Sequence, residues 1–245
     1  MARINDLLAA AVATLPPKPD DGARQPEKKA YSERLSRVLA LAFAEELRLR
    51  GMTGARPAAP GELGDSGAER RIAGGIGAKK VDVTWATEES GLILGISIKT
   101  INFRDAKTRN FQKNLTNRRA DMLMEAVTLH RRFPYAVLAG FFFFDKEAES
   151  DATEKRRSTL HNAHARLRLF TGRNDPAGRD EQYERLYLVL LDAGAETSAI
   201  RAWEVGRPDQ EVALHDIFAG FADLVSERNP DFYESLDGRL VKAAS

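Results

Sequence analysis

The chain has 245 residues, of which 43% are hydrophobic, and it carries 37 basic and 36 acidic side chains. This length allows one sizeable hydrophobic core, and the near balance of charge excludes a partner that is selected by net charge alone. Because the chain contains no cysteine, disulfides, thiolate metal sites and cysteine nucleophiles are excluded, and a bound metal must use oxygen or imidazole ligands.

The first half of the chain predicts a helix, a loop, a hairpin and a second helix. Apolar residues recur at helical spacing over 31–50, after a segment rich in breakers. Residues 51–67 contain too much Gly and Pro for regular structure and predict a loop. Residues 78–86 and 91–103 are rich in β-branched and aromatic residues, and the polar stretch between them favours a hairpin. A long helix is expected over 108–132.

The second half continues with alternating strands and helices. Residues 135–145 form a fully apolar run, typical of a strand that is buried on both faces. A helix is expected over 149–170, and two further strands over 183–194 and 199–206. The last predicted helix covers 211–230 and ends at an Asn-Pro pair.

This order of elements predicts an α/β fold with a mixed central β-sheet flanked by helices. We expect two regions along the chain. Residues 1–66 would form an N-terminal helical region with a flexible loop, and residues 67–245 would form the core with its C-terminal helix.

The predicted location of the protein follows from what the sequence lacks. No stretch of eighteen apolar residues is present, so we expect no membrane partner. The apolar patch near residue 10 lacks the charged start and the small-residue cleavage site of a secretory signal. We therefore expect a cytoplasmic protein.

The predicted hairpin contains one acid and one lysine that can share a site. Because successive residues of a strand project to opposite faces, Ser97 and Lys99 point one way, and Ile96 and Ile98 point the other way. In a twisted hairpin the start of the first strand lies beside the end of the second, so Asp82 can lie near Lys99.

A carboxylate beside a lysine is suited to phosphodiester hydrolysis. The carboxylate can hold Mg²⁺, which prefers oxygen ligands, and the lysine can orient or deprotonate water. The alternative is that both residues lie on the surface. Asp82 would then pair with Lys79 or Lys80, and Lys99 would discourage pairing at a strand edge.

The stretches VDV around Asp82 and SIK ending at Lys99 resemble the motif of the PD-(D/E)xK nuclease superfamily, which has the restriction-endonuclease-like fold. The order of elements over about 69–206 is also similar to the core of that fold. The resemblance implies that Asp82 is the first acid of the motif and Lys99 its lysine. SIKTINF followed by the basic segment KNLTNRR looks most like type II restriction endonucleases.

The sequence departs from the motif at two positions. Val81 replaces the proline, which is not a ligand, and Ser97 occupies the position of the second acid. A hydroxyl is a poor replacement for a carboxylate on a divalent cation, so another acid would have to supply the ligand. Glu69, just before the hairpin, is the favoured candidate, and Glu125 on the following helix is the second. The resemblance thus implies a catalytic group of Asp82, Lys99 and Glu69 supported by Ser97, with Mg²⁺ as cofactor.

Positive charge is concentrated in the middle of the chain. Residues 104–119 contain six basic side chains and one acid, whereas 181–237 contain thirteen acids and four bases. A basic face is an ordinary way to approach phosphates, and a solvated helix face is the alternative. The candidate DNA-binding residues are Arg104, Lys107, Arg109, Lys113, Asn114, Asn117, Arg118 and Arg119.

The expected function is Mg²⁺-dependent cleavage of double-stranded DNA by a type II restriction enzyme. The expected partners are a second copy of the chain in a homodimer and a cognate DNA methyltransferase encoded nearby. A non-catalytic DNA-binding module on the same fold is the first alternative, because the second acid of the motif is missing. A repair or structure-specific nuclease is the other.

Overall fold

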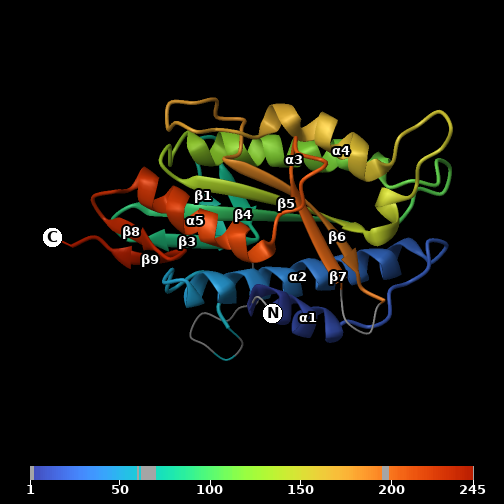
Figure 1. Ribbon diagram of the computed structural model, residues 1–245, viewed down its shortest axis with the longest axis horizontal. Coiled ribbons are helices and arrows are strands. Elements are labelled where there is room, and N and C mark those ends of the chain that lie inside the picture. Colours follow the sequence, from blue (N-terminus) through green and yellow to red (C-terminus); the bar gives the residue numbers. More distant parts are fainter. Residues whose placement is uncertain (1–2, 60, 62–69, 195–198, 245) are drawn as a thin grey trace.

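A five-stranded mixed sheet forms the centre of the protein (Figure 1). The computed structural model describes residues 3–59, 61, 70–194 and 199–244. The strands lie in the order β3-β4-β5-β6-β7, with parallel pairs β4–β5 and β5–β6 and an antiparallel strand at each edge. Their bounds are Val83–Thr87, Gly91–Ile101, Val137–Asp145, Arg185–Asp192 and Ala199–Glu204. The predicted α/β class and mixed sheet are confirmed.

Helices cover both faces of this sheet (Figure 1). On one face lie α1 (Arg3–Ala13), α2 (Gln25–Leu49) and α5 (Leu214–Arg228), and on the other lie α3 (Gln112–His130) and α4 (Thr159–Leu167). Each face has its own hydrophobic cluster. Residues 1–66, expected as an N-terminal helical region, therefore contribute α1 and α2 to the same core as the sheet and α5.

The central strand β5 shows why the sheet needs two helical layers. Its phenylalanines alternate, so that Phe141 and Phe143 pack on the α2 and α5 side, and Phe142 and Phe144 pack on the α3 and α4 side. All four are completely buried. The apolar run over 135–145 thus forms the predicted strand that is buried on both faces.

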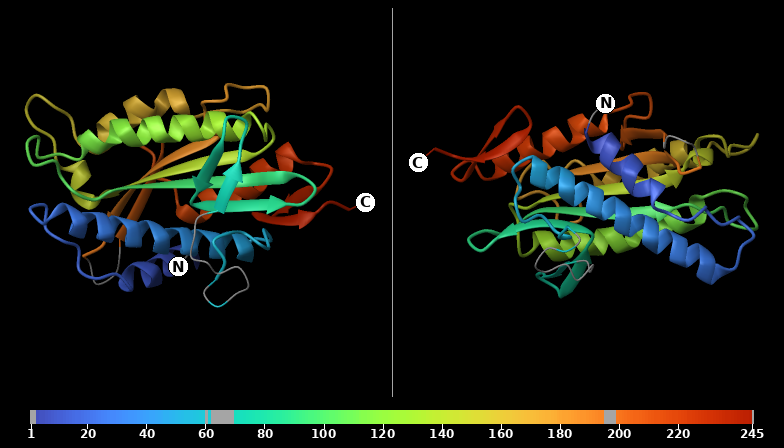
Figure 2. Two further views of the ribbon diagram at one scale, coloured as in Figure 1. Left: turned by 180° about the vertical axis from the view of Figure 1, so that it is seen from behind. Right: turned by 90° about the horizontal axis from the view of Figure 1, so that it is seen from below.

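The predicted strand over 78–86 is in fact two strands that belong to different sheets. β2 (Ala78–Val81) pairs with β1 (Arg70–Ala73), and β3 pairs with β4, with Asp82 in a bend between them. The β1–β2 hairpin rises from the sheet toward α3 (Figure 2). At its turn, the Gly75 N–H donates to the Thr128 carbonyl of α3 over 2.8 Å.

The helix predicted over 149–170 is confirmed for its second half, and its first half was wrong. The chain forms a short 3₁₀ turn, η1 (Lys146–Glu149), before α4, and a second one, η2 (Arg168–Phe170), after it. The buried Asp151 carboxylate accepts hydrogen bonds from the backbone N–H of Thr159 and Phe111, which draws the segment before α4 out of a helical path. Ser158 then caps α4 by accepting from His161 N–H.

Three further differences lie near the ends of the chain. Helix α1 and the hairpin β8 (Tyr233–Leu236) with β9 (Arg239–Lys242) were not predicted. Helix α2 begins at Gln25, six residues before the predicted start, because Pro26 lies in its first turn and Glu27 accepts from the Arg24 N–H.

In the described part of the chain, no helix is long and apolar enough to cross a membrane.

Gly140 of β5 lets α3 approach the sheet. It pairs with Ser97 of β4, and a Cβ at this position would collide with Met122 of α3 and lie 2.6 Å from the Leu186 side chain. We expect Gly140→Ala to lower the free energy of unfolding by about 1–3 kcal/mol, as overpacking does in buried sites. Denaturant unfolding measures this change. Gly220→Ala in α5 is the control, because its Cβ meets nothing within 4 Å and should stabilise the helix by roughly 0.5–1 kcal/mol. An unchanged stability of Gly140→Ala would contradict the close packing of α3.

Candidate active site

Asp82 lies where β4 loses its partner strand. β3 pairs with β4 only as far as Ile96, so the last residues of β4 leave one edge without a β3 partner. The bend at Asp82 turns its carboxylate onto this edge, where Oδ2 accepts a hydrogen bond of 2.6 Å from the Ile98 N–H. A charge-assisted bond of this kind holds the carboxylate in one orientation. Its side chain is 14% exposed, so one part of it still faces solvent.

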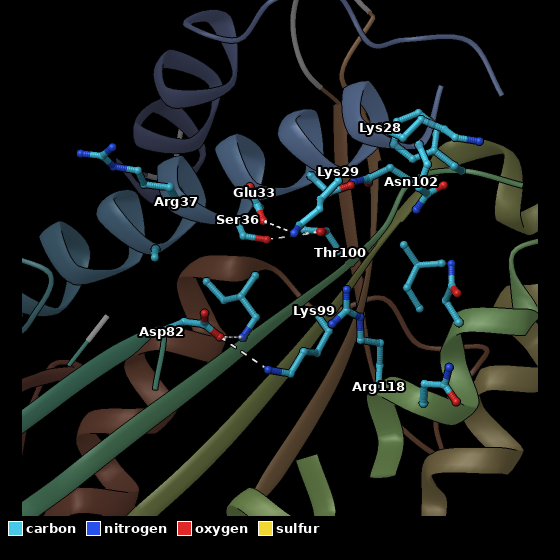
Figure 3. A pocket seen from close by; sticks show the side chains of 18 of the residues that line it. Lys28, Lys29, Glu33, Ser36, Arg37, Asp82, Lys99, Thr100, Asn102 and Arg118 are labelled. Atoms are coloured by element: carbon cyan, nitrogen blue, oxygen red, sulfur yellow. Dashed lines mark hydrogen bonds and ion pairs between the residues drawn. The ribbon is translucent and has the colours of Figure 1, made fainter. Parts of the chain in front are cut away.

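Lys99 lies between two carboxylates. Its Nζ is 3.9 Å from Asp82 Oδ2 and 3.9 Å from Glu125 Oε2 of α3. Figure 3 shows Asp82 and Lys99 pointing toward one another. At 3.9 Å the charges attract without forming short hydrogen bonds, which leaves room for the ammonium to engage a further anion. The sequence therefore predicted correctly that Asp82 and Lys99 lie close together.

Glu125 enters the site from α3 and is almost completely buried. The Ser97 hydroxyl donates to its Oε1, and the Tyr183 hydroxyl lies 3.4 Å from the same oxygen. Oε2 is left facing Lys99. Since Ser97 and Lys99 both meet Glu125, whereas Ile96 and Ile98 pack in the cluster on the opposite face, the predicted strand alternation is confirmed.

Burial determines the electrostatics of Glu125. Loss of hydration raises the pKa of the Glu125 carboxyl, and the nearby Lys99 ammonium and the Ser97 hydroxyl partly oppose this rise. Burial together with the charge of Glu125 also raises the pKa of the Tyr183 phenol well above its ordinary value. Tyr183 therefore stays a neutral hydroxyl that can donate a hydrogen bond.

Tyr183 is the member of this site that sequence reasoning missed. It lies just before β6, 58 residues from Glu125 along the chain, and its hydroxyl is also 3.2 Å from the Met122 carbonyl. No local pattern marks it, because only the packing of α3 against β6 brings the two segments together. Ser97 was expected to support the site, and its contact with Glu125 gives it a definite partner.

The donor atoms of the site fit a hard divalent cation. Asp82 and Glu125 offer carboxylate oxygens on two sides of one lysine, and Mg²⁺ binds through one or two carboxylates while keeping several waters. Within the described residues no group of three or more His, Cys, Asp or Glu side chains forms a larger cage. Glu69, the acid favoured from the sequence, lies outside the described residues.

A cleft of about 1180 Å³ opens beside this group, between α2 and α3, with the end of β4 as its floor (Figure 3). Eight basic and three acidic side chains line it, so the cleft is electropositive. The basic residues are Lys28, Lys29, Arg37, Lys80, Lys99, Arg104, Lys113 and Arg118.

Five of the eight predicted DNA-binding residues line this cleft, and three do not. The five are Arg104, Lys113, Asn114, Asn117 and Arg118, and the other three are Lys107, Arg109 and Arg119. Arg119 instead lies over the Phe170 ring at 5.3 Å, on the side of α3 that faces α4. Lys107 and Arg109 are exposed in the loop before α3.

The cations that line the α3 side are not equally available to a ligand. Arg104 is held 3.2 Å from Glu147, and Lys113 lies 2.6 Å from Asp105, whose carboxyl pKa it lowers. Arg118 extends from α3 into the cleft (Figure 3) and has no hydrogen-bond or ion-pair partner within the described chain. Arg118 is thus the cation on this helix that is most available to a phosphate.

The arrangement combines a carboxylate pair with a lysine between them, and Asp82 and Lys99 of this group line an electropositive cleft, whereas Glu125 is buried behind Lys99. Such a group can bind a divalent cation and an anionic ester side by side. Comparison with protein-family models, with curated proteins and with solved structures finds no match to this chain.

Proposed function

We propose that this protein is a Mg²⁺-dependent endonuclease that hydrolyses phosphodiester bonds of double-stranded DNA. The observation that carries the proposal is the meeting of Asp82, Lys99 and Glu125, of which Asp82 and Lys99 line an electropositive cleft. The restriction-endonuclease-like fold is part of the proposal. It is supported by the order of the bend at Asp82, the strand that carries Lys99 and the helix that follows it.

In this mechanism Asp82 and Glu125 would hold the metal ion, and Lys99 would act on the substrate. When bound, the ion would neutralise charge that develops on the phosphate and lower the pKa of a water molecule. Lys99 would donate hydrogen bonds to the phosphate or to the attacking water, and would stabilise the negative charge of the transition state. The Ile98 N–H keeps Asp82 in place, and Ser97 with Tyr183 directs Oε2 of Glu125 into the site.

This assignment gives the serine in the motif a role. Compared with the motif, a serine at position 97 removes one carboxylate from β4. Its hydroxyl instead donates a hydrogen bond to the Glu125 carboxylate of α3. Glu125 therefore replaces Glu69 as our first choice for the second metal ligand, because its position beside Lys99 is described. Glu69 stays a prediction.

Our more specific proposal is a type II restriction enzyme that acts as a homodimer. It is supported by the similarity of SIKTINF and the basic α3 segment to that class. Two subunits would provide one active site for each strand, and a symmetric dimer would imply a palindromic target. A cognate methyltransferase would protect the host DNA.

Incubation of the purified protein with unmethylated phage DNA, in Mg²⁺ and in chelator, tests the proposal. Discrete bands that need Mg²⁺ are the expected result. Metal-dependent cleavage restricted to branched or damaged DNA would point to a repair nuclease instead. Intact DNA that nevertheless shifts on a gel would identify a non-catalytic binding module. If the protein neither binds nor cuts the DNA, the nuclease assignment is overturned.

A further inference from the structure

One face of α2 forms the wall of the cleft opposite α3. The α2 residues that line the cleft recur every three or four positions from Gln25 to Arg37, which places them on a single stripe. The buried side of the same helix carries Tyr31, Leu35 and Leu39 against the sheet. At 1.5 Å per residue the stripe is about 18 Å long, which matches roughly five phosphates of one B-DNA strand along its axis.

The stripe carries more positive than negative charge. Lys28, Lys29 and Arg37 lie on it with one acid, Glu33. Lys28 is held by the Asp21 carbonyl, and the exposed Lys29 lies 3.7 Å from Glu33, a pair that contributes little in water. Arg37 is exposed and has no side-chain partner in the part of the chain that is described. Lys29 and Arg37 are therefore available to an anion.

The two walls face each other with charge of the same sign. On α3 the available cation is Arg118, and on α2 the available cations are Lys29 and Arg37. Like charges across a cleft repel, and a polyanion between them removes this cost. A helix face that is positively charged only for contact with solvent would not need a second positively charged helix opposite it. The cleft is thus electrostatically suited to a phosphodiester chain that is contacted from both sides.

The position of the stripe is fixed relative to the active site. The Ser36 hydroxyl of α2 lies 3.3 Å from the Thr100 hydroxyl, and Thr100 directly follows Lys99 (Figure 3). The loop before α2 is also anchored, because Asp21 accepts from the Arg104 N–H over 3.0 Å. A strand that lies along α2 would therefore pass the catalytic lysine.

We propose that α2 is a second DNA-binding wall, which contacts phosphates of the bound DNA through Lys29 and Arg37. This inference rests on the proposed nuclease function and adds the N-terminal half of α2 to the DNA interface. The N-terminal helix would then determine how tightly the substrate binds, whereas Asp82, Lys99 and Glu125 would determine how fast it is cut.

Binding of a fluorescent DNA duplex in chelator, measured over a range of salt concentrations, tests the proposal without cleavage. Lys29→Ala and Arg37→Ala should each reduce the slope of log K against log salt by about 1, and Lys29→Glu with Arg37→Glu should weaken binding at least tenfold. Arg34→Glu is the matched control, because Arg34 is exposed on the same helix but does not line the cleft. It should bind within about twofold of the wild-type protein.

Thermal unfolding of each variant checks that the helix is intact. If the Lys29 and Arg37 variants bind like Arg34→Glu while the wild-type protein binds and cuts DNA, the α2 wall is refuted and the nuclease stands. If the wild-type protein neither binds nor cuts DNA, both proposals fail. Glu33→Gln provides a test of opposite sign, since removal of this acid from the stripe should tighten binding.

Discussion

Asp82→Asn and Lys99→Ala are each expected to reduce Mg²⁺-dependent DNA cleavage by roughly 10²- to 10⁴-fold, the range for loss of a group that acts in the transition state. Asn keeps the shape of Asp82 and an oxygen that can accept from the Ile98 N–H, but it loses the charge that holds a cation. Lys99→Ala removes the ammonium between the carboxylates. Single-turnover cleavage at saturating enzyme measures the rate without a contribution from binding.

Glu88→Gln is the matched control for the loss of one acid. Glu88 is exposed in the turn at the other end of the same hairpin and does not line the cleft. Its cleavage rate should equal that of the wild-type protein. Full activity of either active-site variant would refute the assignment of Asp82 and Lys99, and an unchanged affinity for DNA in chelator would show that the loss lies in the chemical step.

Glu125→Gln is expected to reduce cleavage by roughly 10²-fold or more while leaving the melting temperature unchanged or higher. The amide can still accept from Ser97 and Tyr183, so the local structure is retained. Because burial raises the pKa of Glu125, its ionised form is less stable in the folded protein than in water, and its replacement removes this cost at neutral pH. Cleavage assays and thermal unfolding on the same preparation measure both effects.

Three comparisons make this experiment specific. Asp121→Asn removes an exposed acid one turn away on α3 and should leave cleavage unchanged. Tyr183→Phe removes only the second contact to Oε1 and should cause a smaller loss than Glu125→Gln. If Glu69→Gln abolishes cleavage and Glu125→Gln does not, the second ligand is Glu69.

The hairpin could be predicted because its information is local. Alternation of apolar residues and a polar turn are sufficient to place Ser97 and Lys99 on one face and to bring Asp82 to the end of β4. The split of the first strand into β2 and β3 could not be read from the sequence, because Asp82 bends the chain without Gly or Pro.

The choice of the second acid depended on packing that no local pattern reports. Glu125 reaches Lys99 because α3 packs on this face of the sheet, where the Met122 side chain lies against Gly140, and the sequence alone does not show that packing. The α2 wall was missed for a related reason. Its cations are about eighty residues before those of α3, so the charge pattern along the chain does not show that they share a cleft.

The contact between the β1–β2 turn and α3 has a mechanical consequence. Asp82 directly follows β2, and the turn of that hairpin is bonded through Gly75 to Thr128, one helical turn from Glu125. Glu125 thus lies on α3, and Asp82 follows a hairpin whose turn is bonded to the same helix. Helix α2 lies on the other face of the sheet and is connected to β4 through the hydrophobic core and the contact between Ser36 and Thr100. Substitution of a side chain that lines the cleft on α2 would therefore change the contact with DNA while the spacing of the two acids, and with it the affinity for a cation, stays the same.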